Sequence, residues 1–469
     1  MIDGLRPYSE TKPSGLPWLG EMPSHWDVRR NGRLFGSRRE TGFPDLPVLE
    51  VSLRSGVRVR DFENGTRKQE MGDRSKYQRA VRGDIAYNMM RMWQGAVGVV
   101  PVDGLVSPAY VVARPFEETD AAYYAYLFRT SAYMREVDTF SRGIVPDRNR
   151  LYWEAFKQIP SVYPPFEEQR LIARLLDWHG AQTAKLIRAK KKIIALLNEQ
   201  KQAIIHRAVT RGLDPNVCLK PSGIAWPGDV PEGWDVVPLK RLASFKSGAG
   251  FPVSEQGGKD LDIPFLKVSD MNLAGNERYI EAWNNSISQQ TARALGAYIF
   301  PRNTIIFPKV GGAMLTNKRR ILKRESCIDN NIMGCTVRSG IIPYVFLTLE
   351  QIDFGKVSKP GPVPAIGEGE VREIRVALPQ IEEQQKILEW LDSETRSIDQ
   401  AVNFAYSEIA LIQEFRTRLI ADVVTGKLDV RSTATSLPEA VEYEAIVELA
   451  EDDEFEEAAN ELENEEVAA

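Results

Sequence analysis

Apolar residues recur every three or four positions along two long stretches of the chain. In the later stretch the series is Ile398, Val402, Ala405, Ile409, Ile412, Arg416, Leu419 and Val423. The same positions 215 residues earlier hold Thr183, Ile187, Lys190, Ile194, Leu197, Lys201, Ile204 and Ala208. This spacing predicts two helices of about 40 residues, each with a heptad-like apolar seam. Because one long helix cannot bury such a seam alone, we expect the two helices to pack against each other.

The two stretches begin and end alike. PPFEEQRLIARLLD (164–177) and PQIEEQQKILEWLD (379–392) are identical at seven of fourteen positions. Proline and paired glutamates are favoured in the first turn of a helix, so Glu167 and Glu382 are interpreted as N-terminal capping charges. The far ends, AVTRGLD and VVTGKLD, align at the same offset and contain a glycine typical of helix ends.

A tryptophan-containing segment precedes each half. SGLPWLGEMPSHWDV (14–28) and SGIAWPGDVPEGWDV (222–236) are identical at eight of fifteen positions. The blocks that follow, roughly 29–158 and 237–373, share no obvious identity although their lengths are similar. The chain is therefore an internal repeat in which two divergent modules lie in a common framework. Two modules of similar size and different content suggest two different ligands of one class.

Short alternating apolar runs broken by glycine turns predict mixed α/β modules in both variable blocks. Examples are LPVLEVSL (46–53) and IPFLKVSDMN (263–272). The expected fold class is therefore α+β. It consists of two mixed α/β domains separated by two long antiparallel coiled-coil helices with pseudo-twofold internal symmetry.

The net charge conceals a basic body. The 469 residues carry a formal charge of −5, but fourteen acidic and no basic residues follow from Glu439 onward, and without them the charge is +9. A basic body permits a nucleic-acid partner. The acidic tail is interpreted as a disordered solubilising segment, or alternatively as a competitor of DNA phosphates for the basic body.

Basic and amide side chains in predicted loops are the candidates for contact with DNA. Arg and Lys bind phosphates or guanine edges, and Asn and Gln bind adenine. TNKRR (316–320) is the densest basic cluster, for which a solvated surface turn is the alternative interpretation. The candidates are Arg91, Gln94, Arg142 and Arg148 in the first block, and Lys309, Asn317, Lys318, Arg319 and Arg320 in the second.

Motifs for catalysis are missing from the sequence. It contains no G-x-x-x-x-G-K-[ST] phosphate loop and no Asn/Asp-Pro-Pro-aromatic loop of the kind that amino-methyltransferases use. Three cysteines and three histidines show no metal-ligand spacing. No run of about 18 apolar residues and no secretory signal is present. We therefore expect a cytoplasmic protein without catalytic residues, metal site or membrane span.

These features resemble the specificity subunits of type I restriction-modification systems. The resemblance rests on the two W-x-G-x-x-P-x-x-W segments, the two P-x-x-EEQ helix starts and the two V-T-x-x-L-D helix ends. GDIAYNMMRMWQGA, SPAY (107–110) and IPFLKVSDMN are also similar to stretches of such subunits. The resemblance covers roughly residues 5–430, and the acidic tail is longer than the family pattern requires.

The resemblance implies target-recognition domains at 1–160 and 215–375, conserved spacer helices at 161–214 and 376–430, and the tail at 431–469. Each domain would bind one half of a bipartite, asymmetric site in double-stranded DNA, and the helices would fix the spacing between the halves. Two modification (methyltransferase) subunits and two restriction (translocase and nuclease) subunits would be the partners. Those subunits would bring S-adenosylmethionine, ATP and Mg, and this chain would hold no cofactor.

Four residues of the framework are candidates for partner binding. Ile193 and Leu196 lie off the apolar seam, and Gln169 and Gln384 follow the paired glutamates at the helix starts. Two other classes of function stay open. A coiled-coil scaffold or adaptor would explain the helices but not the basic loops, and a self-contained restriction enzyme would require the missing motifs.

Overall fold

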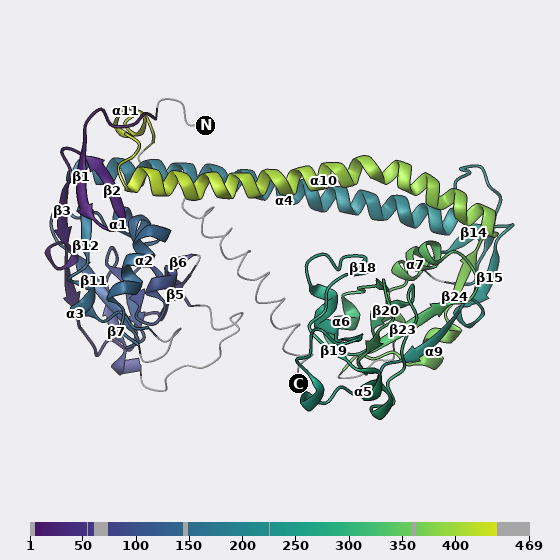
Figure 1. Ribbon diagram of the computed structural model, residues 1–469. Coiled ribbons are helices and arrows are strands. Elements are labelled where there is room, and N and C mark those ends of the chain that lie inside the picture. The colour runs from purple at the N-terminus through teal and green to yellow at the C-terminus, as the bar shows by residue number, and fades with distance from the viewer. Residues whose placement is uncertain are drawn as a thin grey trace. The chain divides into compact units, whose positions relative to one another are not determined.

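The computed structural model describes residues 5–438 except 54, 61–73, 144–148, 225 and 359–362. Most of the predicted acidic tail, residues 439–469, therefore lies outside the described residues. The described chain divides into two compact units (Figure 1). The first unit contains residues up to Lys192 together with residues from Ala405 onward, and the second contains Ile193–Phe404. Both units combine helices and sheets, which confirms the predicted mixed composition.

The two predicted long helices are present. Helix α4 (Phe166–Arg211) has 46 residues and helix α10 (Ile381–Val424) has 44. Each begins directly after the proline-containing segment that the sequence marks as a helix start. A glycine in the left-handed region follows each helix: Gly212, with φ 72°, directly after α4, and Gly426, with φ 78°, two residues after the end of α10. Because only glycine adopts this conformation without steric cost, the glycines end the helices where the pattern predicts.

In the first unit, the beginning of α4 packs antiparallel against the end of α10. The rings of His179 and Phe415 lie 5.6 Å apart. Lys190 Nζ lies 2.7 Å from Glu408 Oε2. As the residue number rises along α4 it falls along α10, so the helices run in opposite directions. Ile187, at 1% exposure, lies in the buried seam, as the heptad spacing predicts.

In the second unit, the end of α4 packs against the beginning of α10 with the same antiparallel sense. Lys201 Nζ lies 2.5 Å from Asp399 Oδ1. Ile205 of α4 and Ile387 and Leu391 of α10 belong to one buried apolar cluster. Lys201 occupies a seam position in the sequence pattern, and its charge pairs across the two helices.

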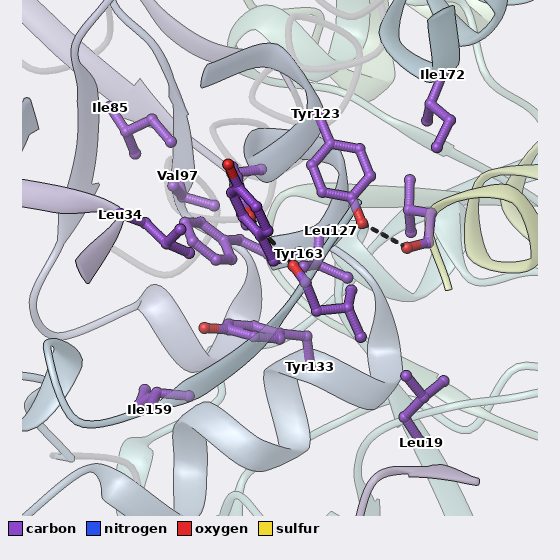
Figure 2. Packing of buried hydrophobic residues seen from close by; sticks show 14 of the residues in the cluster. Leu19, Leu34, Ile85, Val97, Tyr123, Leu127, Tyr133, Ile159, Tyr163 and Ile172 are labelled. Atoms are coloured by element: carbon purple, nitrogen blue, oxygen red, sulfur yellow. Dashed lines mark hydrogen bonds between the residues drawn. The ribbon is translucent and has the colours of Figure 1, made fainter. Parts of the chain in front are cut away.

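A four-stranded antiparallel sheet forms the centre of the first unit. Its order is β4 (Phe35–Arg38), β11 (Tyr110–Pro115), β8 (Ile85–Asn88) and β9 (Val97–Val99). Helices α1 (Ala121–Phe128) and α2 (Ser131–Phe140) pack against it through an aromatic cluster that includes Tyr123, Tyr124, Phe128 and Tyr133 (Figure 2). The apolar faces of α4 and α10 join this core, which fixes the sheet to the helices.

The second unit contains a five-stranded sheet. Its order is β16 (Ala243–Ser247), β23 (Ile332–Val337), β20 (Ile305–Pro308), β21 (Arg320–Leu322) and β18 (Tyr279–Ile280). The pairs β16–β23, β23–β20 and β20–β21 are antiparallel, and β18 is parallel to β21. Helix α7 (Ile342–Glu350) packs against this sheet within the main apolar cluster of the unit.

Shorter elements complete the two units. In the first unit they are β1 (Thr11–Leu16), β2 (Leu19–Pro23), β3 (Asp27–Arg30), η1 (Asn31–Arg33), β5 (Leu49–Ser52), β6 (Gly56–Val59), η2 (Arg74–Lys76), β7 (Gln78–Ala80), η3 (Met92–Gln94), β10 (Gly104–Val106), α3 (Trp153–Phe156), β12 (Pro160–Tyr163) and α11 (Arg431–Ala434). In the second unit they are β13 (Leu219–Pro221), β14 (Asp229–Pro231), β15 (Asp235–Pro238), η4 (Leu239–Arg241), η5 (Val253–Glu255), β17 (Ile263–Leu266), η6 (Val268–Asn272), β19 (Ser286–Ile287), α5 (Gln289–Ala294), α6 (Gly311–Leu315), β22 (Cys327–Ile328), α8 (Phe354–Val357), α9 (Glu368–Glu373) and β24 (Arg375–Leu378). Among the helices that the structure describes, none is long and apolar enough to cross a membrane.

Candidate nucleic-acid interface

The second glutamate of each EEQ motif binds the second tryptophan of the repeated segment. In the first unit Trp26 Nε1 donates to Glu168 Oε1 at 3.1 Å. In the second unit Trp234 Nε1 donates to Glu383 Oε1 at 3.0 Å. Both tryptophans are fully buried, so each indole N–H needs an internal acceptor. This bond explains why the tryptophan segment and the helix start occur together in both halves of the sequence.

The first of these two carboxylates carries additional partners. The side chain of Glu168 also lies 2.8 Å from His25 Nε2 and accepts a hydrogen bond from the hydroxyl of Tyr8. Burial and the bond to Glu168 raise the pKa of Tyr8, so the hydroxyl keeps its proton and remains a donor. In the second unit a glycine, Gly233, aligns with His25 in the repeated segments. The first unit therefore holds its helix start with more polar contacts than the second.

The glutamines of the two EEQ motifs are structural, which corrects the prediction that Gln169 and Gln384 bind partners. Both are buried, at 0% and 1% exposure. Gln169 accepts from the backbone N–H of Asp120 at 2.9 Å and donates to the Pro164 carbonyl at 2.8 Å. Gln384 accepts from the N–H of Ile341 at 2.9 Å and donates to the Pro379 carbonyl at 2.9 Å. Gln169 thus links α4 to Asp120, the residue before α1. Gln384 links α10 to Ile341, the residue before α7.

A tyrosine makes the return contact in each unit. Tyr123 of α1 donates to the carbonyl of Val424 in the last turn of α10 at 2.9 Å (Figure 2). Tyr344 of α7 donates to the carbonyl of Val209 in the last turns of α4 at 3.4 Å. The last four carbonyls of a helix have no intrahelical donor, so these tyrosine hydroxyls stabilise the helix ends. Each unit is therefore bonded to the start of one long helix and to the end of the other.

Ile193 and Leu196, the other two candidates for partner binding, are exposed. Their exposed fractions are 51% and 55%. Phe404 of α10, also in the second unit, is 66% exposed. Ile193 and Leu196 lie three residues apart on α4 and are therefore neighbours on its surface. Adjacent exposed apolar side chains of this kind can contribute to a protein-binding patch.

The TNKRR loop is held internally. Asn317 adopts φ 53° and accepts from the N–H of Phe354 at 3.2 Å. Lys318 Nζ donates to Asn272 Oδ1 at 2.8 Å. Two nitrogens of Arg320 donate to the carbonyl of Met271 at 3.0 and 3.2 Å. The side chains of Asn317, Lys318 and Arg320 are half-buried, so the loop is not the solvated turn of the alternative interpretation.

Arg319 is buried at 1% exposure, which corrects its assignment to a DNA-facing surface. Its guanidinium lies 4.1 Å from the centre of the Phe354 ring and donates to the carbonyl of Ile352 at 2.9 Å. Burial lowers the pKa of Arg319 to about 10, while Glu350 and Asp353 oppose that shift. The side chain is thus a charged core residue that joins the start of β21 to α8.

The remaining sequence candidates lie on the surface or at its edge. Arg91 and Gln94 are exposed at η3, between β8 and β9. Lys309 is half-buried and donates to Ser247 Oγ at 3.0 Å. Arg142 is exposed, and Arg148 lies outside the described residues.

Arg142 lines a cleft of 1010 Å³ in the first unit. Its basic lining residues are Arg39, Lys76, Arg142 and Arg150. Its aromatic lining residues are Tyr110, Phe140, Tyr152 and Trp153. The acidic lining residue is Glu154, which forms an ion pair with Lys157. A positively charged cleft with interspersed aromatic and amide groups is suited to a polyanion with planar bases.

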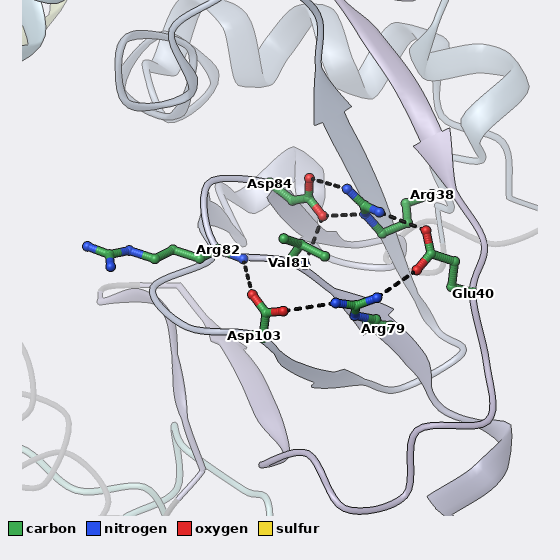
Figure 3. Close-up of polar contacts among 7 residues, drawn as sticks. All are labelled: Arg38, Glu40, Arg79, Val81, Arg82, Asp84 and Asp103. Atoms are coloured by element: carbon green, nitrogen blue, oxygen red, sulfur yellow. Dashed lines mark hydrogen bonds and ion pairs between the residues drawn. The ribbon is translucent and has the colours of Figure 1, made fainter.

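The alternation of β4 continues past its last residue, Arg38, and directs Arg39 to the cleft. Ser37, Arg39 and Thr41 line it, as residues two apart on an extended chain share a face. Arg38 points to the other side, where Nε donates to Asp84 Oδ2 at 2.7 Å and a second nitrogen contacts Glu40 (Figure 3). Arg79 links Glu40 to Asp103 in the same network. The acidic residues of this region thus neutralise Arg38 and Arg79.

Within the described residues, the guanidinium groups of Arg39, Arg142 and Arg150 form no hydrogen bond or ion pair. Arg142 and Arg150 lie side by side because their backbones exchange two hydrogen bonds of 3.1 and 3.0 Å. All three arginines are exposed, and Tyr152 beside them is 47% exposed. Unpaired guanidinium groups can bind phosphate or guanine bidentately. Nothing in the part of the chain that the structure describes gathers three or more metal-binding side chains.

Sequence reasoning missed Arg39, Arg150 and Tyr152. The run RNRLYW (148–153) combines basic, amide and aromatic residues and could have drawn attention to the last two. Arg39 has no such signal in the sequence, because its place in the cleft depends on which side of the sheet its side chain lies on.

Comparison with known proteins agrees with this architecture. Residues 231–403 match the family model described as the type I restriction modification DNA specificity domain. The chain is 25% identical over 286 residues to the type I restriction enzyme MjaVIII specificity subunit of Methanocaldococcus jannaschii, which covers 59% of this chain. It is 26% identical over 265 residues to the MjaIX specificity subunit of the same organism, which covers 54% of this chain. The matches span 64% and 52% of those relatives' own lengths.

One solved structure is similar over most of the chain. It comes from work on the structural basis of complex assembly and conformational transition of the type I R-M system. The TM-score is 0.62 at 14% identity, and the match covers 86% of this chain and 98% of the other. At this identity the likeness shows the fold alone. Together the comparisons confirm the resemblance to type I specificity subunits.

Proposed function

We propose that this chain, whose residues 231–403 match a type I DNA specificity domain, is the non-catalytic DNA-recognition subunit of a type I restriction-modification complex. The observation that carries the proposal is the basic cleft of the first unit. Three exposed arginines without ion pairs surround aromatic side chains there, while neighbouring arginines are neutralised. Such an arrangement supplies donors for phosphates and for the acceptor edges of bases.

The finer organisation is part of the same proposal. Residues 1–160 and 215–375 would be two target-recognition domains, each binding one half of an asymmetric duplex site. Residues 161–214 and 376–430 would be antiparallel spacer helices that set the distance between the halves. The repeated contacts of Glu168 and Glu383 with tryptophans support two equivalent copies of one framework.

The partners also follow from the proposal. Two methyltransferase subunits would bind the framework, and two translocase-nuclease subunits would join for cleavage, in the cytoplasm. Exposed Ile193 and Leu196 support a protein-binding surface on α4. S-adenosylmethionine, ATP and Mg would belong to those subunits, and this chain would supply recognition.

A salt titration of DNA binding tests the proposal. The full-length chain should bind random-sequence duplex DNA with an affinity that falls steeply as salt rises, because bound phosphates release counterions. Arg142→Ala should make the salt slope shallower by about one, as expected for one lost phosphate contact. Arg82→Ala is the matched control, since Arg82 is exposed and lies outside the cleft lining. Binding without salt dependence, or no binding at all, would refute DNA recognition.

A scaffold or adaptor function is the second candidate. The exposed apolar residues of α4 and α10, Ile193 and Phe404 among them, favour it. A scaffold would bind partner proteins while showing no affinity for DNA in the salt titration.

A further inference from the structure

The two central sheets have the same backbone register although their sequences show no obvious identity. In the first unit Ala113 of β11 pairs with Ser37 of β4 and with Ile85 of β8. In the second unit Cys335 of β23 pairs with Phe245 of β16 and with Ile305 of β20. The fourth strands also agree, since Ile85 pairs with Val99 and Ile305 with Ile321. These pairings assign each residue of one sheet a counterpart in the other.

Backbone hydrogen bonds outside the sheets extend the correspondence. The N–H of Leu151 donates to the carbonyl of Met89 at 2.8 Å. The N–H of Ile366 donates to the carbonyl of Lys309 at 2.9 Å. Met89 and Lys309 are therefore counterparts, as are Trp153 and Glu368, each two residues after the donor.

The turn before the third strand matches in the same way. The N–H of Gly83 donates to Val100 at 2.9 Å, and that of Asn303 donates to Leu322 at 2.7 Å. Both turn residues have positive φ, 90° for Gly83 and 66° for Asn303. Arg82 and Arg302, the residues before them, are thus counterparts, and both are exposed.

Core counterparts keep their chemistry. Tyr87 corresponds to Phe307 and Ile85 to Ile305, and all four residues have 0% exposure. Counterparts at the cleft differ in chemistry. Arg39, Met89 and Trp153, all of which line the cleft of the first unit, correspond to Ser247, Lys309 and Glu368.

The three counterparts in the second unit are also in mutual contact. Lys309 Nζ donates to Ser247 Oγ at 3.0 Å. The backbone N–H of Ser247 donates to Glu368 Oε1 at 2.7 Å. Lys309 and Glu368 are only half-buried, so their charges remain accessible from outside.

We infer that these three paired positions, 39, 89 and 153 in the first unit and 247, 309 and 368 in the second, determine the sequence specificity of the two halves of the bound site. The inference rests on the proposed DNA-recognition function. A common backbone would present one cation and a large aromatic ring in the first unit, and an ammonium beside a carboxylate in the second. An arginine fork binds the two acceptors of guanine, whereas a carboxylate accepts from the amino group of cytosine. The same three backbone positions would thus recognise different bases in the two units.

Exchange of counterpart residues tests the inference. The full-length chain and its variants are each used to enrich sites from a random duplex library, and the bound DNA is sequenced. Arg39→Ser and Lys309→Met each introduce the residue that the other unit holds at the counterpart position, Ser247 and Met89. Arg39→Ser should lower the preference for one or two base pairs in one half-site about tenfold. Lys309→Met should do the same in the other half-site.

Matched controls come from the exposed turn that precedes the third strand. Arg82→Ser and Arg302→Met also remove one positive charge each, at counterpart positions outside the three paired positions. They should leave the base preference in both half-sites unchanged. Arg39→Lys is a second variant that keeps the charge and the fold. It should retain affinity but change the base preference, because lysine lacks the bidentate fork.

The outcomes are distinguishable. Changes confined to different half-sites for Arg39→Ser and Lys309→Met support the inference. Changes in the same half-site, or unchanged half-sites in variants that remain folded, overturn it while leaving DNA recognition intact. A wild-type chain that enriches no motif overturns the proposed function and with it this inference.

Discussion

At the scale of single residues, the two framework carboxylates are chemically alike but differ in their number of partners. Glu168 accepts hydrogen bonds from Trp26 and Tyr8 and lies beside His25. Glu383 accepts a hydrogen bond from Trp234. Glu168→Ala should therefore lower the free energy of unfolding of the first unit by about 2–4 kcal/mol, since several buried donors lose their acceptor. Glu383→Ala should cost about 1–2 kcal/mol in the second unit. Denaturant unfolding followed by tryptophan fluorescence measures both, and equal losses would contradict this ranking.

Asp177 of α4 predicts a pH dependence. Burial raises its pKa to about 6, against the hydrogen bond from Tyr126. The carboxyl of the unfolded chain ionises near its ordinary pKa, whereas that of the folded chain ionises only near pH 6. The folded state therefore loses stability as pH rises from about 4 to about 6 and regains it on acidification. Asp177→Asn removes this penalty, and the amide oxygen of the asparagine can still accept the hydrogen bond that the Tyr126 hydroxyl donates.

Thermal unfolding of Asp177→Asn and wild type at several pH values checks this sign. The variant should be more stable by about 1–3 kcal/mol at pH 7.5, and the difference should vanish below about pH 4. A constant difference across this range would show that Asp177 is not the titrating group.

Residue chemistry alone predicted the basic candidates only in part. Arg142 lies in the cleft, but Arg319, from the densest basic cluster, lies over Phe354 inside the second unit. A buried basic side chain just before a strand and an exposed one in a solvated loop have the same local sequence pattern. Which of the two occurs depends on tertiary packing, here on a ring 35 residues further along the chain.

At the scale of elements, the long helices were predictable because every local signal agrees. Proline and glutamate at the start, apolar spacing along the seam and glycine at the end all indicate the same boundaries for α4 and α10. The cleft was not predictable, since Arg39, Tyr110, Arg142 and Trp153 come from separate elements. No periodic pattern joins residues that only the fold brings together.

The helix pair also gives a prediction about spacing. Insertion of one heptad into both α4 and α10, after Lys190 and before Glu408, keeps the apolar seam in phase. It adds about 10 Å of helix, so the gap between the two half-sites should lengthen by up to about three base pairs. Site enrichment from a random library measures the gap. The half-site bases should stay unchanged, and altered bases at constant spacing would refute the role of the helices as a ruler.

At the scale of the whole molecule, the segment around Arg6 contacts the segment around Asp429, at the place where the other half of the repeat is one continuous chain. The N–H of Asp429 donates to the carbonyl of Arg6 at 2.7 Å, and the Arg431 guanidinium lies 5.3 Å from the Tyr8 ring centre. By the offsets of the repeat, Arg6 and Asp429 both correspond to Asp214. In the first unit, noncovalent contacts therefore join the segment after α10 to the N-terminal segment. In the second unit, the covalent chain after α4 joins the equivalent segments.

This closure predicts that the chain tolerates circular permutation. A permuted chain would join residue 437 to residue 5 through a short Gly/Ser linker and begin at Asn216, in the exposed segment between α4 and β13. All contacts of Glu168 and Glu383 would be kept, so unfolding free energy should change by less than about 2 kcal/mol, mainly through loop closure. The enriched DNA motif should be that of the wild type. A permutant opened inside α4 at Ile187 should fail to fold, because it interrupts the buried seam. If the permutant opened at Asn216 also failed, the contacts between the two ends would not suffice to close the framework.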